Sequence, residues 1–247
     1  WVDVHEAPST ENIRITQALM GESVLVIGQR GSWSEVRSSG QFSWQGWVQT
    51  DQLTVGSARV RERWRKGPLL VIVRAPTIPL AHDVRLPFGA ILPQDVDNCS
   101  ESNCVLMPDG RTVQVGVADA VFAENGLPMT TIIERAKLFR RIPFEQGANT
   151  QEAMDGAGFV YLLHRAAGIP VPRDINSLMK AGIGVAAGVW RPGDVIFFSG
   201  FDPDEPWVGL LLDDGQTYLA ATPAGGVSVG LVEQMRNWKI VAVRRFS

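Results

Sequence analysis

Histidine, the side chain that most often transfers protons in catalysis, is rare in this chain. The histidines are His5, His82 and His164. His164 lies in an apolar run, eight residues after Gly156. Because a helix rises about 1.5 Å per residue, a helix over this run would put His164 roughly 12 Å past Gly156, too far for a hydrogen bond. We expect His164 to be an ordinary residue near a helix C-terminus, where its positive form is favoured.

Asp155 directly precedes Gly156, at the start of the same run. A carboxylate alone hydrolyses amides poorly without a metal ion. The sequence has no HExxH-like or other metal-binding spacing. We therefore expect no metal and no other cofactor.

The two cysteines, Cys99 and Cys104, flank four polar residues in the stretch DNCSESNC. One interpretation is a disulfide that closes a hairpin tip, which would indicate an oxidising compartment. The other is a pair of free thiols. With no nearby histidine, the pair offers too few ligands for zinc.

The residues that follow position 126 carry the elements that would position Asp155. The stretch PMTTIIERAKLFRRIPF has apolar residues near helical spacing, and Thr130 or Thr131 is the expected cap. A second helix is predicted from about Gly158 to Ala167, ending at Gly168. Several strands joined by Gly, Asp and Pro turns come after it. Helices followed by sequential strands predict an α+β domain with an antiparallel sheet.

Residues 1–126 instead show short β-rich runs broken by turns, in two blocks that resemble repeats of one small barrel. We predict three domains, over residues 1–56, 57–126 and 127–247. The second begins with a connector, GSARVRERWRKGP, that holds five basic residues and Glu62. These basic residues either contact an anionic polymer or, as we expect, form a solvated face.

The composition is that of an ordinary globular protein, with 247 residues, 45% hydrophobic residues and a net charge of −3. The charge gives no indication of a nucleic-acid partner, and no apolar run is long enough to span a bilayer. The sequence starts at Trp1, so a removed export signal stays open.

The stretch MDGAGFVYLLHRAAGIPVPRD, followed by RPGDVIFF and WVGLLLDDGQTYLAAT, resembles the NlpC/p60 family of papain-like cysteine peptidases. These enzymes act on the peptide stems of bacterial peptidoglycan. The resemblance covers residues 128–247. TQALMGESV and GWV, and then LPFGAILP and MPDGRT, are similar to the two bacterial SH3-like modules of one branch, the γ-D-glutamyl-L-diamino-acid endopeptidases. The resemblance thus implies a papain-like α+β domain preceded by two small all-β SH3-like barrels.

The same resemblance places the catalytic positions on residues that lack the chemistry. The family's nucleophilic cysteine falls on Gly156, its general base on Trp207, and its third polar residue, twelve positions later, on Leu219. An indole N–H is a donor only and takes up no proton at neutral pH. We expect the Trp207 indole to lean over Gly156. Simple core packing and an aromatic wall for a ligand are the alternatives.

Because the catalytic groups are missing, the resemblance implies a role in binding. Asp155 and Trp44 match positions that hold the stem peptide in the related endopeptidases, and Glu22, Arg173 and Asp174 are further ligand-binding candidates. The chain is interpreted as a pseudoenzyme that binds peptidoglycan stem peptides, other muropeptides or a cell-envelope protein. A regulatory scaffold with a closed cleft and a cell-wall hydrolase with an atypical site are the alternatives. An extracytoplasmic location is expected, and a cytoplasmic one stays open.

Overall fold

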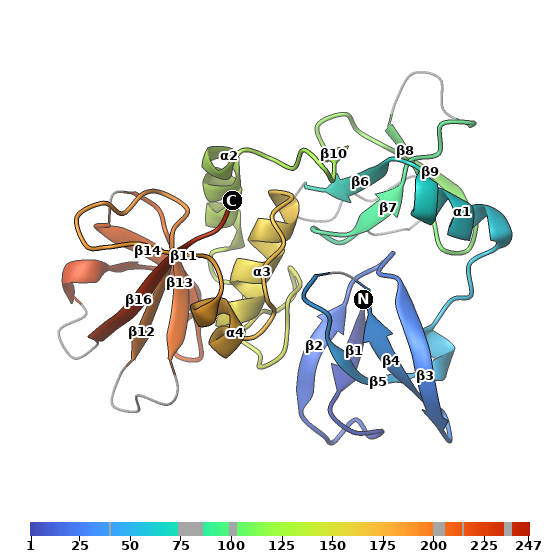
Figure 1. Cartoon of the computed structure of the whole chain (residues 1–247), viewed down its shortest axis with the longest axis horizontal. Coiled ribbons are helices and arrows are strands. Elements are labelled where there is room, and N and C mark those ends of the chain that lie inside the picture. Colours follow the sequence, from blue (N-terminus) through green and yellow to red (C-terminus); the bar gives the residue numbers. More distant parts are fainter. Residues whose placement is uncertain (40, 74–85, 99–102, 200–205, 214, 235–238) are drawn as a thin grey trace. The chain divides into compact units, whose positions relative to one another are not determined.

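The structure is a computed structural model that describes all residues except 40, 74–85, 99–102, 200–205, 214 and 235–238. The chain divides into two compact units, an N-terminal unit over Trp1–Gly126 and a C-terminal unit over Leu127–Ser247 (Figure 1).

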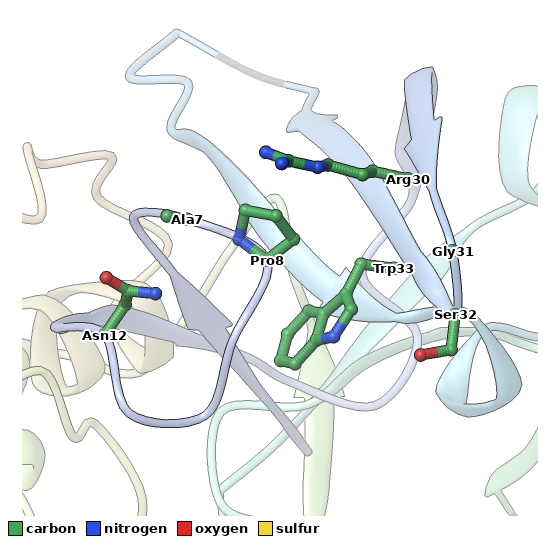
Figure 2. A pocket seen from close by; sticks show the side chains of 7 residues that line it. All are labelled: Ala7, Pro8, Asn12, Arg30, Gly31, Ser32 and Trp33. Carbon is green, nitrogen blue, oxygen red and sulfur yellow. The ribbon is translucent and has the colours of Figure 1, made fainter.

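The N-terminal unit begins with an antiparallel five-stranded sheet in the order β2-β1-β5-β4-β3. Its strands are β1 (Val2–His5), β2 (Arg14–Ala18), β3 (Val24–Arg30), β4 (Trp33–Ser38) and β5 (Gln45–Gln49), and a short 3-10 turn, η1 (Thr50–Gln52), follows. Val4, Ala18, Val36 and Val48 form its buried core. The turn between β1 and β2 and the turn between β3 and β4 line one hollow of this sheet (Figure 2).

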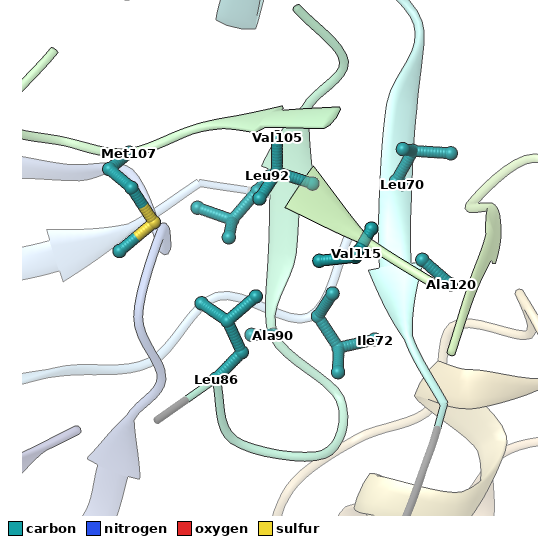
Figure 3. Close-up of a cluster of buried hydrophobic side chains, with 9 residues drawn as sticks. All are labelled: Leu70, Ile72, Leu86, Ala90, Leu92, Val105, Met107, Val115 and Ala120. Atoms are coloured by element: carbon teal, nitrogen blue, oxygen red, sulfur yellow. The ribbon is translucent and has the colours of Figure 1, made fainter. Parts of the chain in front are cut away.

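The second half of this unit holds one helix and two small sheets. The sheets are β10-β6-β7 and β8-β9, linked by a bridge between Gln94 and Val105. The elements are α1 (Ala58–Lys66), β6 (Leu69–Ile72), β7 (Ile91–Pro93), β8 (Asn103–Leu106), β9 (Thr112–Val115) and β10 (Ala120–Phe122). Figure 3 shows their shared core of aliphatic side chains and Met107. Both halves of the N-terminal unit are therefore built on β-sheets, as predicted.

Helix α1 is the predicted basic connector, and four of its five basic residues are exposed, as expected, while Arg63 is half-buried. Ser57 caps the helix by accepting a hydrogen bond from the N–H of Val60. Arg59 donates to the buried carboxylate of Asp95 at 2.7 Å, and Arg63 pairs with Asp97. Two of the five basic residues thus pair with acidic residues outside the helix.

The C-terminal unit is an α+β domain with a six-stranded antiparallel sheet in the order β11-β16-β12-β13-β14-β15. Its helices are α2 (Met129–Ala136), α3 (Gly156–Ala166) and α4 (Ile175–Lys180), with the 3-10 turns η2 (Lys137–Phe139) and η3 (Val232–Gln234). Its strands are β11 (Ile183–Gly184), β12 (Val195–Ser199), β13 (Trp207–Leu211), β14 (Thr217–Thr222), β15 (Gly226–Leu231) and β16 (Lys239–Arg245). Helix α3 packs against β13 and β14.

Two predicted helix starts differ from the structure. Pro128 occupies the N-cap of α2 without a side-chain cap, so Thr130 and Thr131 lie inside the helix and the prediction that one of them caps it is wrong. Proline suits a helix start because its fixed φ is already helical. Helix α3 starts at Gly156, two residues earlier than predicted, because Asp155 accepts a hydrogen bond from the N–H of Gly158.

Candidate functional site

The N-terminus of α3 is organised by the buried carboxylate of Asp155. Its Oδ1 accepts hydrogen bonds from the N–H of Gly158 at 2.6 Å and from Arg173 at 3.0 Å. Its Oδ2 accepts from the N–H of Gly147 at 2.7 Å and from Arg173 at 3.1 Å. A carboxylate has about four lone-pair sites, and all four are filled here.

Arg173 completes this arrangement by binding two groups with one guanidinium. It holds Asp155 through both of its terminal nitrogens, and one of them also donates to the carbonyl oxygen of Ala148 at 3.1 Å. The side chains of Arg173 and Asp155 are only 9% and 8% exposed. The pair therefore fixes the loop at Gly147–Ala148 to the first turn of α3. This geometry gives both residues a use that needs no ligand, and their role in ligand binding stays a prediction.

Gly156 lies in a confined space at the start of the helix. A Cβ atom built on it would lie 3.1 Å from Cγ1 of Val208, 3.4 Å from the oxygen of Val208 and 3.5 Å from that of Ala221. Val208 is thus the nearest neighbour of the position expected for the nucleophile. None of these nearest atoms belongs to Trp207. A Cβ at Gly158, in contrast, would overlap the carbonyl oxygen of Ala148.

The strand register puts Trp207 and Leu219, the two other predicted catalytic positions, on opposite faces of the sheet. Leu219 pairs with Leu210, so both side chains share a face of the sheet. Leu210 also shares its face with Val208, which faces α3. Trp207 alternates with Val208 and packs, together with Ala220, into a cluster that includes Phe198 and Leu211.

Ala220 is therefore an alternative to Leu219 that counting along the sequence did not offer. A group that orients a general base must lie on the face of that base, and Ala220 shares the face and the cluster of Trp207. Side chains alternate between the two faces of the sheet along β13 and β14. This alternation identifies Ala220 only when the strand register is known, and the sequence does not give the register. Leu219 as the third position stays a prediction, but the register favours Ala220, which also lacks a polar group. The Trp207 ring additionally lies 6.3 Å from the ring of Phe144, in the loop before α3.

His164 is completely buried on the same helix, which corrects the expectation that its positive form is favoured. Burial lowers the pKa of His164 to about 4. Its Nδ1 lies 2.9 Å from the carbonyl oxygen of Val160, and the ring edge contacts Phe246. Its Nε2 has no hydrogen-bond partner among the residues that the structure describes. The favourable field of the helix C-terminus contributes at most about 2 kcal/mol, and desolvation outweighs it. His164 is a neutral core residue.

The remaining candidates lie in separate surroundings. Asp174 caps α4 by accepting from the N–H of Ser177 at 2.8 Å. In the N-terminal unit, Glu22 accepts from the N–H of Leu19 at 2.8 Å, and Trp44 packs on the core of the five-stranded sheet. Their roles toward a ligand stay predictions.

The predicted disulfide falls partly outside the described residues. Cys104 is buried in β8 and is not a free thiol, whereas Cys99 lies outside the part of the chain that the structure describes. Their pairing stays a prediction. His82 and the loop with Asp202, Asp204 and Glu205 also lie outside the described residues.

The described residues contain no group of three or more His, Cys, Asp or Glu side chains that could hold a metal ion. No helix among them is both long and apolar enough to cross a membrane.

Comparison with known proteins assigns both units. The sequence profile of the NlpC/P60 family matches residues 141–245, the range that holds α3, the Asp155–Arg173 pair and the six-stranded sheet. The C-terminal unit carries an NlpC/P60 domain. A second profile, that of the bacterial dipeptidyl-peptidase SH3 domain, matches residues 4–53 and so covers the five-stranded sheet. The predicted combination of an NlpC/P60 domain and an SH3-like domain is confirmed.

Proteins similar to this chain are named as peptidases. The chain is 26% identical over 208 residues to the γ-D-glutamyl-L-lysine dipeptidyl-peptidase of Bacillus cereus (strain ATCC 10987 / NRS 248), covering 74% of this chain and 60% of that protein. It is 26% identical over 250 residues to the protein of the same name from Bacillus subtilis (strain 168), covering 96% and 82%. The crystal structure of an NlpC/P60 family protein from Bacillus cereus ATCC 10987 has the same fold, with a TM-score of 0.78 and 22% identity over 94% of this chain and 82% of the other.

Proposed function

We propose that this NlpC/P60 protein binds peptide stems of peptidoglycan, or a cell-envelope partner, without cleaving peptides through a thiol. The observation that carries the proposal is the composition of the C-terminal unit. Residues 127–247 contain no cysteine, and their one histidine is His164, which is buried and neutral. Gly156 stands where the family resemblance places the nucleophile.

Thiol catalysis needs three groups in contact, and each predicted position lacks its group. The thiolate is the nucleophile, an imidazole takes and returns the proton, and a third polar group orients the imidazole. Gly156 has no side chain, Trp207 offers only a donor N–H, and both Leu219 and Ala220 are apolar. The surrounding frame of Asp155 and Arg173 supports a peptide-binding fold but supplies no proton carrier.

The names of the relatives suggest which ligand to test first. They are called γ-D-glutamyl-L-lysine dipeptidyl-peptidases, so a stem peptide with a γ-D-glutamyl-L-lysine bond and a free L-Ala terminus is the proposed ligand class. Within the C-terminal unit, Asp174 is the proposed contact and Asp155 with Arg173 shapes the site. Trp44 and Glu22 are proposed ligand contacts of the N-terminal unit.

The test uses the full chain and the tripeptide L-Ala-γ-D-Glu-L-Lys. Calorimetry measures binding, and mass spectrometry after long incubation at high protein concentration measures cleavage. We expect binding without product. Product that persists after metal removal and thiol blocking would instead establish a hydrolase with an atypical site. The Trp44→Ala variant should weaken binding, whereas Trp64→Ala, in α1, serves as the control.

A second candidate function, a scaffold with a closed cleft, has two observations in its favour. A Cβ built on Gly156 would lie 3.1 Å from Cγ1 of Val208. All four lone-pair sites of Asp155 accept hydrogen bonds from within the unit. A scaffold of this kind would give no binding heat with the tripeptide or with longer muropeptides, so the same calorimetry separates the two candidates.

The proposed ligand also implies a location in the cell envelope. Peptidoglycan lies outside the cytoplasmic membrane, so a protein that binds its intact stems would act there. Cell fractionation with antibody detection tests this proposal, and recovery in the cytoplasm alone would instead indicate a role with imported peptidoglycan fragments.

A further inference from the structure

Two hollows on the first sheet of the N-terminal unit share the side chain of Trp33. One, of about 470 Å³, lies between the β1–β2 turn and the β3–β4 turn. The other, of about 250 Å³, lies toward the start of β1 and the end of β5. Trp33 lines both hollows and therefore forms a ridge between them. Neither hollow includes any part of the α3 site.

Trp33 is held in place by its neighbours while part of its ring stays accessible. It begins β4, pairs with Gln49 in the sheet, and meets the His5 ring edge-on at 5.6 Å. The His5 ring is itself fixed, since its Nδ1 lies 3.0 Å from the carbonyl oxygen of Asn12. A rigid aromatic side chain loses little entropy when a ligand packs on it.

The larger hollow has a cation on its rim. Figure 2 shows the side chains of Arg30 and Trp33 extending toward the turn that carries Ala7, Pro8 and Asn12. Within the described part of the chain, the Arg30 guanidinium makes no ion pair. A guanidinium of this kind matches the geometry of a carboxylate.

The smaller hollow is lined by side chains that both donate and accept hydrogen bonds. Thr10, Gln49 and Gln52 line it, together with the carboxylate of Asp3 and the indole of Trp1. Asp3 uses Oδ1 to accept from Gln17 at 2.8 Å. Amides, a hydroxyl and a carboxylate next to aromatic faces suit a ligand with hydroxyl groups around an apolar ring face.

We propose that these two hollows form one binding site for an oligosaccharide that carries a carboxylate. A sugar ring packs its C–H face on Trp33, its hydroxyl or acetamido groups bind the polar side chains of the smaller hollow, and its carboxylate pairs with Arg30. A peptide added as a strand would need an open sheet edge. Strands β4 and β5 are paired on both sides, β4 with β3 and β5, and β5 with β4 and β1. Strand β3, which ends at Arg30, lies at the edge of the sheet, so beside Trp33 a peptide could add only along β3. The rim consists of turns and side chains.

The test titrates the full chain with three probes by calorimetry. The probes are peptide-free peptidoglycan strands with free lactyl carboxylates, neutral chitotetraose, and the tripeptide L-Ala-γ-D-Glu-L-Lys. We expect the carboxylate-bearing strands to bind more tightly than chitotetraose. Trp33→Ala should weaken both sugars by about tenfold or more, and Arg30→Gln should weaken only the carboxylate-bearing strands, by about tenfold.

Matched variants keep the test decisive. Arg111→Gln makes the same change on an exposed side chain outside the hollows and should leave all three affinities unchanged. If Trp33→Ala fails to fold by circular dichroism, Trp33→Phe and Arg30→Gln carry the test, because both retain the local packing. Absence of sugar binding, or sugar binding that neither Trp33 nor Arg30 affects, overturns the proposal. Tripeptide binding that Trp33→Ala or Arg30→Gln weakens, without any sugar binding, also overturns it. The tripeptide titration tests the proposed binding of stem peptides separately. Either proposal can therefore be refuted while the other holds.

Discussion

The buried histidine of α3 predicts a specific loss of stability in acid. Folded His164 takes up a proton only at about pH 4, because burial disfavours the charged ring. The unfolded residue does so below about pH 6.5. Between these values the unfolded chain binds more protons, so the free energy of unfolding falls as the pH falls. The gap corresponds to about 3 kcal/mol, present in full above pH 6.5 and lost by about pH 4.

The measurement compares the full chain with its His164→Leu variant. Leucine removes the titrating group, keeps apolar contact with Phe246, and favours the helix. Hydrogen exchange of the α3 amides, followed by mass spectrometry from pH 4 to 7, reports the opening free energy of this unit after correction for intrinsic exchange rates. We expect the advantage of the wild type over the variant to shrink by about 3 kcal/mol on going from pH 7 to pH 4.

The control is His5→Leu, a change in the other unit that should leave the pH dependence of the α3 amides unaltered. Parallel curves for the wild type and His164→Leu would refute the reasoning. They would mean that the ring is protonated in the folded state, or that its Nε2 is paired with water or another group.

The first turn of α3 yields two further predictions. Gly158→Ala should destabilise the C-terminal unit by about 3 kcal/mol or more, because its Cβ would overlap the carbonyl oxygen of Ala148; Gly156→Ala, the matched control, should stay within about 1 kcal/mol, since only the Val208 methyl must move. Equal effects in thermal unfolding would contradict this. Arg173→Met should cost about 3–5 kcal/mol, because it leaves the carboxylate of Asp155 buried without its cation. Denaturant titration should show that adding Asp155→Asn costs less than the sum of the two single changes, and strict additivity would argue against a coupled pair.

Local signals in the sequence were enough to predict α3 and its end. Asp155 before a Gly-Ala-Gly turn is typical of an N-cap, and Gly168 has a φ of 73°, as a helix-ending glycine needs. What local signals could not give is the partner of Asp155. Arg173 lies 18 residues away, and only the packing of the chain after α3 brings it to the helix start.

The burial of His164 escaped prediction for a related reason. A histidine near a helix C-terminus usually faces solvent, but nine of the eleven residues of α3 are buried. The helix is covered on nearly all sides, so position along its axis says little about exposure. The arginines of α1 show the same limit, since Asp95 and Asp97 are thirty-six and thirty-four residues from the arginines that they pair with.

The contacts that hold the start of α3 do not depend on the side chain at position 156. Asp155, Arg173, Gly158 and the Ala148 carbonyl contact one another directly, and Gly156 contributes no side chain to any of these contacts. The helix start is therefore intact whether or not position 156 carries a nucleophile, so the fold says little about catalysis. It also follows that a thiol restored at Gly156 alone would sit at a well-formed helix start without an imidazole to exchange its proton. On the proposed assignment, the positions of the base and its orienting partner lie on β13 and β14, and the frame around Asp155 does not supply these groups.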